Sequence, residues 1–376
     1  MKHDISFLQY FEEIEDPRVD RHKLHSLSDI LLILFCGVIC GAESWRDFSD
    51  FGESKIDYLR RFSPLENGIP SKNTFNRVVS SLNHEQFKNC FNNWIKGVQR
   101  ELGDVIAIDG KVLRGSFNKA TDKSAIHMVS AFSSSAKLVL AQQKVDDKSN
   151  EITAIPKLLK LLELKGAVVT IDAMGCQKAI TQDIIDGGGD YAIAVKGNQK
   201  NLHEQIKSHF SNTFDMQHHK KVDVATTKIK NRNRIESRMC LATNSIDWLQ
   251  GKEKWSGLKS ILMIESKRTL NGITSCEKRY YISSLEANAE ELNRIVRAHW
   301  SVENSLHWVL DVVFREDDSR NRLGNTAENM AIMKHVTLNQ LQTAKTGFKK
   351  DMSIKRLRKK SGWDNATLDT ILMTTL

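Results

Sequence analysis

The chain has 376 residues, of which 40% are hydrophobic and 27% charged, as expected for a globular protein of two or three domains. Lysine and arginine outnumber aspartate and glutamate by 55 to 46, which gives a net charge of +9. This modest basic excess suits a protein that holds nucleic-acid phosphates, although a merely basic protein is the alternative. The longest apolar run, residues 30–42, is too short to span a bilayer and predicts a buried helix.

The cysteines indicate a reducing compartment. All six are scattered along the chain, and no second cysteine or histidine pair completes a zinc site. Residues 1–16 are acidic and amphipathic, which is unlike a signal peptide. We therefore expect a cytoplasmic location.

The first hundred residues predict a helical domain, because apolar residues recur there at spacings of three and four. Ser28 can cap a helix that begins at Asp29 and contains the apolar run. A second helix follows Ser71, and a third covers residues 84–102. The pattern changes at residues 103–104, a Gly-Asp pair.

A layered α/β domain follows this change. Its predicted order is a strand, a hairpin over residues 126–145, a helix, a strand, a helix and a strand, which indicates a mixed sheet. The next segment is strand-like, with Asn271-Gly272 as a hairpin turn, and it precedes one long amphipathic helix. We expect a helical N-terminal domain, the first part of the core, a β-rich insertion, a catalytic helix that completes the core, and a basic C-terminal tail, over residues 1–100, 101–200, 201–285, 286–345 and 346–376.

Two aspartates follow apolar strand sequence in the α/β domain. Asp109 lies in AIDG and Asp172 in VVTIDA. A charged side chain in a buried strand costs free energy unless it is paired or binds a metal, so the two predict a shared site on adjacent strands. The alternative is that each aspartate only caps the turn that follows it.

A third acid, Glu303, lies in the long helix beside the apolar stripe. His299 and His307 are four residues away on either side, on the same helix face. A structural ion pair with Arg297 is the alternative to metal binding. Three carboxylates from separate elements suit Mg²⁺, and two such ions about 4 Å apart could activate a nucleophile and stabilise a leaving oxygen. From these residues alone, a metal-dependent nuclease is a hypothesis and no more.

Long blocks of sequence in a specific order add a resemblance. They are HSLSDILLILFCGVICGAESWRDFSDFG, ENGIPSKNTFNRVV, VIAIDGKVLRGS, KSNEITAIPKLL, TIDAMGCQ, DYAIAVKGNQ, RYYISSL and RAHWSVENSLHWVLDVVFREDDSR. On these blocks, nearly end to end, the chain resembles the H-repeat-associated transposases, a bacterial insertion-sequence family of the DDE class. The resemblance implies an RNase H-like core behind a helical domain, with Asp109, Asp172 and Glu303 as the three catalytic, metal-binding acids.

The resemblance also implies an activity and partners. It implies cleavage at the ends of a mobile element and strand transfer into target DNA, with Mg²⁺ as cofactor, Mn²⁺ as a possible substitute, and two ions. The partners would be double-stranded DNA, both the inverted repeats and the target, and further copies of the chain in a homodimer or higher assembly. The alternatives are a catalytically silent DNA-binding or regulatory protein derived from a transposase, and a nuclease without end specificity.

Some positions depart from the wider superfamily. His299 and Leu310 stand where an arginine and a lysine often flank the glutamate, and Asn231 and Asn233 replace an expected His-Gly pair. Other side chains would then contact the DNA, and the candidates are Lys111, Arg114, Lys196, Arg297, His299 and His307.

Two charged runs have alternative interpretations. Asp311 and residues 316–318 could attract a metal, but a solvated acidic loop is the favoured interpretation. The basic run 355–360 predicts either a DNA-binding tail or a solvated helix face.

Overall fold

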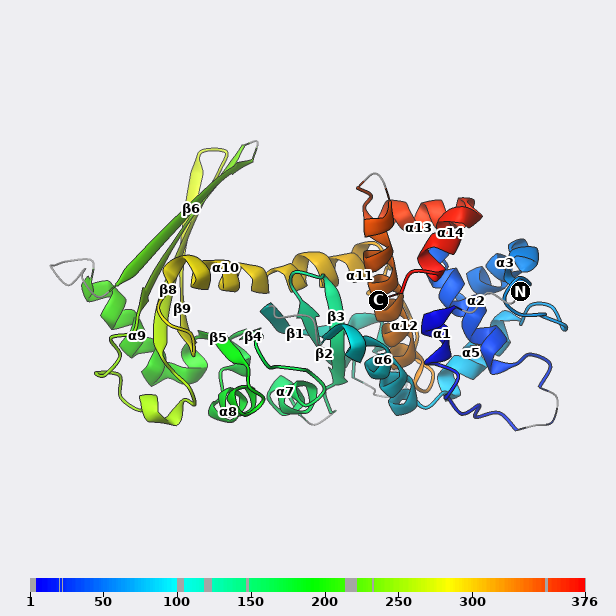
Figure 1. The fold of residues 1–376 in the computed structure, drawn as a ribbon, viewed down its shortest axis with the longest axis horizontal. Helices are drawn as coiled ribbons and strands as arrows, with labels where there is room; N and C mark the ends of the chain where they lie inside the picture. Colours follow the sequence, from blue (N-terminus) through cyan, green and yellow to red (C-terminus); the bar gives the residue numbers. More distant parts are fainter. Residues whose placement is uncertain are drawn as a thin grey trace.

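The computed structural model describes residues 5–19, 21, 23–99, 105–117, 124–146, 149–213, 222–231, 233–348 and 351–375. Figure 1 shows three regions along its longest axis: a helical region, a central sheet covered by helices, and a long projecting ribbon of strands. The expected domain change at residues 100–104 lies outside the described residues.

The N-terminal region is helical, as predicted, with α1 Ser6–Gln9, α2 Leu27–Cys40, α3 Trp45–Ser54, α4 Ile56–Leu59, α5 Lys72–Ser81 and α6 His84–Gln99. Ser71 caps α5, but the cap of α2 is Ser26 and not Ser28, because the extended backbone of Ser26 lets its side chain accept a hydrogen bond from the Asp29 N–H. Helix α2 is buried from Ile30 to Ile39. No single described helix is long and apolar enough to cross a membrane, and only α2 with α3, bent by 96°, passes as a pair.

The central sheet explains why the two aspartates lie close together. Strands β1 Val105–Leu113, β2 Ile126–Ser133 and β3 Leu138–Lys144 form an antiparallel meander, and β4 Val168–Ile171 and β5 Asp190–Val195 run parallel to β1. The order β3-β2-β1-β4-β5 is the mixed sheet of an RNase H-like core, as expected. Helices α7 Glu151–Leu159 and α8 Lys178–Asp186 lie on one side of this sheet and α10 on the other (Figure 1).

The predicted insertion extends this same sheet. It begins with α9 Lys200–Thr213 and continues with β6 Asp223–Asn231, β7 Arg234–Thr243, β8 Ser260–Leu270 and β9 Ile273–Ser283. Strand β9 pairs antiparallel with β5, so the full sheet has nine strands. Asn271 and Gly272 both have positive φ, 50° and 81°, which confirms the predicted hairpin turn. In the β6–β7 turn Asn233 is exposed, whereas residue 232 and the side chain of Asn231 lie outside the described residues.

The long amphipathic helix is present but is not one regular α-helix. It consists of α10 Ala289–His299, a π-helical segment η7 Val302–His307, and α11 Trp308–Val312. The apolar residues of α10 pack on the sheet, whereas those from Val302 onward join the core of the helical region. The described residues also contain short 3₁₀ helices: η1 Arg114–Ser116, η3 Ala173–Gly175, η4 Gly197–Gln199, η6 Lys252–Lys254 and η8 Lys345–Gly347.

Helix α12, Thr326–Ala344, joins the sheet to the helical region and is buried along most of its length. It carries many buried polar side chains, and that of Asn339 contacts the sheet. The Asn339 amide accepts from the Val139 N–H and donates to the Val139 carbonyl, both at 2.8 Å, and so pairs with the edge strand β3 as another strand would.

The basic C-terminal segment is not a separate tail. Residues 351–375 contain two helices, α13 Ile354–Trp363 and α14 Asn365–Leu372, which pack on α2 and α12. The alternative of a solvated helix face holds for most of the basic run, since Lys355, Arg356, Lys359 and Lys360 are exposed on α13. Their apolar residues enter the core of the helical region. Arg358, from the basic run, is buried, donates to the Val38 carbonyl and stacks 4.2 Å from the Phe314 ring. The spacing of the apolar residues, and not the number of charges, therefore decides that this segment packs on the core.

Candidate active site

Asp109 and Asp172 lie on adjacent parallel strands. The register pairs Ile108 with Ile171, and each aspartate is the next residue. Strand β1 continues past Asp109 to Leu113, so this acid lies inside the strand. Asp172 directly follows the last residue of β4 and caps η3, because its Oδ1 accepts hydrogen bonds from the N–H groups of Met174 and Gly175. The capping alternative thus holds for Asp172 in addition to its place beside Asp109.

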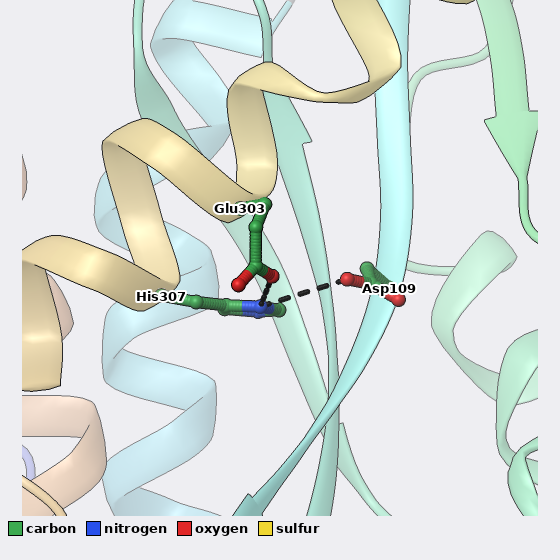
Figure 2. Close-up of side chains that lie close together, drawn as sticks. All are labelled: Asp109, Glu303 and His307. Carbon is green, nitrogen blue, oxygen red and sulfur yellow. Dashed lines mark hydrogen bonds and ion pairs between the residues drawn. The ribbon is translucent and has the colours of Figure 1, made fainter. Parts of the chain in front are cut away.

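Glu303 and His307 approach Asp109 from the long helix (Figure 2). The His307 Nδ1 lies 3.2 Å from Glu303 Oε2 and 3.5 Å from Asp109 Oδ2. One ligand atom of each of the three residues lies within 4.8 Å of the others. Glu303 is 60% exposed and His307 only 7%. In the described part of the chain the side chain that contacts the Glu303 carboxylate is that of His307, and not that of Arg297 as the structural alternative supposed.

The π-helical segment places these two side chains. A π turn contains one residue more than an α turn, and such turns occur often at functional sites. Glu303 and His307 both lie in this segment, where the helix passes from the sheet to the helical region. Periodicity of apolar residues does not distinguish a π turn from an α-helix, so the sequence did not predict it.

Burial and mutual repulsion perturb the acids. The pKa of Asp109 is raised to about 7, first by burial and then by the negative charges of Asp172, Glu151 and Glu303. Burial also raises the pKa of Asp172. The pKa of His307 is lowered, because burial outweighs the attraction of Glu303. Without a cation, therefore, the site disfavours the charged form of each of these groups.

The donor set fits a divalent cation. Two carboxylates and an imidazole, those of Asp109, Glu303 and His307, come together from β1 and η7, and Asp172 lies beside Asp109 on the adjacent strand. Oxygen ligands are those that Mg²⁺ and Mn²⁺ prefer. A cation there would relieve the repulsion that raises the pKa of Asp109. Asp109, Glu303 and His307 are close enough to share one ion.

The predicted DNA contacts Lys111 and Arg114 have different surroundings. Lys111 is only 10% exposed and forms ion pairs with Asp311 and Glu316. Arg114 is 79% exposed, with its Nε 3.7 Å from an Asp317 carboxylate oxygen. Glu316 is 5% exposed, so the interpretation of the acidic segment as a fully solvated loop is wrong there: Lys111 and Lys334 neutralise it inside the protein.

The remaining predicted contacts also differ among themselves. Lys196 is exposed at the end of β5, and its charge acts on Asp172. Arg297 is exposed on α10. His299 lies with Nδ1 3.1 Å from the Thr170 hydroxyl, and burial lowers its pKa to about 4, so it is neutral near pH 7.

A basic groove beside Glu303 was not predicted. It has a volume of about 680 Å³ and lies between the ribbon strands and the long helix. Trp300 and Asn304 form part of its wall, and Arg279 stacks 4.5 Å from the Trp300 ring. Its lining contains two acids, Glu236 and Glu277, which pair with Arg234 and Arg279, and further cations that exceed them. The cationic residues are Arg234, Arg238, Lys267, Arg268, Arg279 and Arg297. Basic residues recurring along the strands of both hairpins are the signal in the sequence that could have indicated this groove.

Comparisons with known proteins agree with this architecture. The family model described as Transposase DDE domain matches residues 100–340, and the one described as DDE_Tnp_1-associated matches residues 8–95. Putative transposase YncI of Escherichia coli O157:H7 is 42% identical over 98% of this chain and 94% of its own length. H repeat-associated putative transposase YhhI of Escherichia coli K12 is 41% identical over 97% of both chains.

A shorter relative, Inactive transposase YbfQ of Escherichia coli K12, is 54% identical over 15% of this chain and 68% of its own length. A solved structure, the cryo-EM structure of piggyBac transposase synaptic complex with hairpin DNA, covers 98% of this chain and 78% of that chain with a TM-score of 0.42 and 12% identity. The family matches and the full-length relatives decide the assignment: the chain belongs to the transposase family defined by the DDE domain.

Proposed function

We propose that this transposase cleaves DNA at the ends of an insertion sequence and transfers the cut strands into target DNA, using Asp109, Asp172 and Glu303. The observation behind this proposal is the convergence of Asp109, Glu303 and His307 from a strand and a π turn, with Asp172 next to Asp109 on the adjacent strand. We further propose Mg²⁺ as the cofactor, with Mn²⁺ as a possible substitute and two ions as the working number.

The side chains of the site differ in how firmly the fold holds them. Asp109 and Asp172 are fixed by the sheet, and their positions relative to each other are set by strand register. His307 holds the exposed Glu303 carboxylate toward Asp109. Bound divalent ions would activate a water or a 3′-hydroxyl and stabilise charge on the phosphoryl oxygens.

The basic groove supports DNA as the partner. Its cations can neutralise phosphates, and its wall at Trp300 and Asn304 adjoins Glu303 in the chain. We place the DNA strand next to the scissile bond along this groove.

Two further proposals concern assembly and location. Two element ends must be held together to be joined, so we propose a homodimer or higher assembly on DNA. We also propose that the protein acts in the bacterial cytoplasm, a location that suits its six free cysteines.

The experiment is a cleavage and strand-transfer assay on labelled DNA from the regions that flank this gene. With Mg²⁺ we expect cut and joined products from the unmutated protein and none from Glu303→Gln. Binding without cleavage in Mg²⁺ or Mn²⁺ would instead indicate a silent DNA-binding or regulatory protein. Cleavage of any duplex without joining would indicate a nuclease that lacks end specificity.

A further inference from the structure

A fourth carboxylate, that of Glu151, lies beside the acid cluster and comes from the opposite side of the sheet. Glu151 is the first residue of α7, which packs against β2, β3 and the η3 turn that Asp172 caps. Its side chain is 15% exposed, and its Oε1 lies 2.8 Å from His127 Nε2 on β2. The imidazole of His127 thus holds one carboxylate oxygen in place.

Gly110 opens the path by which Glu151 reaches the site. A Cβ at position 110 would lie 2.1 Å from Glu151 Oε1 and 2.8 Å from His127 Nε2. Any residue other than glycine would therefore displace the Glu151 carboxylate. Because Gly110 follows Asp109 directly, the missing side chain lets the Glu151 carboxylate lie against β1 one residue from Asp109, on the opposite face of the strand.

Electrostatics supports the same closeness. The negative charge of Glu151 is one of the charges that raise the pKa of both Asp109 and Asp172. A glutamate in the first turn of a helix is ordinarily explained by the helix dipole, which would favour an exposed carboxylate equally well. The burial of Glu151 against a glycine, and its pairing with His127, go beyond that explanation.

We propose that Glu151 is a fourth acid of the metal site and binds divalent cation together with Asp109 and Asp172, with His127 as its positioning residue. The inference rests on the proposed metal-dependent function and deepens it. It also assigns a role to Gly110, which leaves the space that the carboxylate needs.

The test measures Mn²⁺ binding to the full chain without DNA, by titration calorimetry and by the paramagnetic resonance signal of free Mn²⁺. Glu151→Gln keeps the shape of the side chain and removes its charge, and we expect binding to weaken by about tenfold or more. Gly110→Ala leaves every carboxylate in the chain but pushes Glu151 away, so it should weaken binding similarly. Because a flexible side-chain end is what must move, the variant should still fold.

The matched control is Asp146→Asn. Asp146 is an exposed acid five positions earlier in the chain that pairs with Lys157, and its removal should leave Mn²⁺ affinity unchanged. The Mn²⁺ affinity of His127→Gln should lie between that of the unmutated protein and that of Glu151→Gln. Melting temperatures of the metal-free variants check folding, and the increase on adding Mn²⁺ gives a second measure of binding.

Several outcomes would overturn the inference. If Glu151→Gln and Gly110→Ala bind Mn²⁺ as tightly as the unmutated protein while Asp109→Asn does not, Glu151 is only a structural partner of His127. The proposed function would then stand without it. If the unmutated protein itself takes up no Mn²⁺, the metal site and the role of Glu151 both fail.

Discussion

Lys111 and Glu316 form a buried ion pair two residues beyond Asp109. The ammonium lies 2.9 Å from the carboxylate, and the side chains are only 10% and 5% exposed. Lys334 from α12 lies 3.9 Å from the other Glu316 oxygen. These ion pairs thus connect β1, the strand of Asp109, to the segment after α11 and to α12.

Removing the Glu316 charge should therefore destabilise the protein. Glu316→Gln leaves the buried Lys334 without its carboxylate and Lys111 with Asp311 alone, and breaking a buried pair in this way costs about 3–5 kcal/mol. We expect a clear drop in melting temperature by calorimetry. Asp318→Asn removes an acid that pairs with Arg315 at the exposed surface and should change the melting temperature little. Equal effects of the two variants would show that the buried pair has no special role.

The raised pKa of Asp109 predicts a pH-dependent stability in the absence of metal. Its folded pKa of about 7 exceeds the ordinary value of 3.8, so the stability that its protonated form contributes is lost as pH rises through that range. The Asp109→Asn variant keeps this stability at every pH, because asparagine does not ionise. In a chelator, the variant should melt higher than the unmutated protein at about pH 8, and the difference should shrink at about pH 5. Adding Mn²⁺ at the higher pH should reverse the order, and a pH-independent difference would contradict the assignment.

The basic groove predicts the salt dependence of DNA binding. Arg268 and Arg297 are exposed cations of the groove, and removing a cation that neutralises one phosphate should reduce the slope of log affinity against log salt by about 1. Arg268→Gln and Arg297→Gln should both do so in fluorescence anisotropy with element-end DNA. Lys160→Gln, an exposed cation at the end of α7, is the control. An unchanged slope in both arginine variants would place the DNA elsewhere.

The buried contacts of Arg358 indicate that the C-terminal helices stabilise the fold. Its guanidinium donates to backbone carbonyls of Val38 and Val313 and stacks on Phe314. Arg358→Met should cost about 1–3 kcal/mol, because buried carbonyls lose a donor. Lys359→Met, next in the chain but exposed, should stay within about 0.5 kcal/mol. Melting temperatures compare the two, and the same small effect in both would mean that Arg358 is not needed to hold α13 on α2.

The sequence predicted the elements whose signals are local. Changes in apolar period indicated the order of strands and helices, and the Asn271-Gly272 pair indicated its hairpin turn. The approach of Asp109 and Asp172 followed from two acids in buried strands, and the structure places these strands side by side.

Features that depend on long-range packing could not be predicted in this way. The pairing of β5 with β9 joins residues about ninety positions apart, and the sequence of neither strand indicates which strand it pairs with. The many charges around Arg358 in the sequence suggested an exposed segment, although the apolar residues of the same helix are buried in the core. Glu151 looks in the sequence like an ordinary first residue of a helix, and only the fold brings it to Gly110.

The π turn around Glu303 has a consequence for how this enzyme family can vary. A π turn holds one residue more than an α turn, so deleting one residue from η7 would restore a regular helix and leave the helix beyond it facing nearly the same way. Leu310 would still face the helical core, whereas Glu303 and His307, inside the turn, would change their direction relative to Asp109. The extra residue therefore sets the direction of the two site side chains, and we expect insertions and deletions in natural variants to avoid this stretch while they accumulate in the outer hairpins.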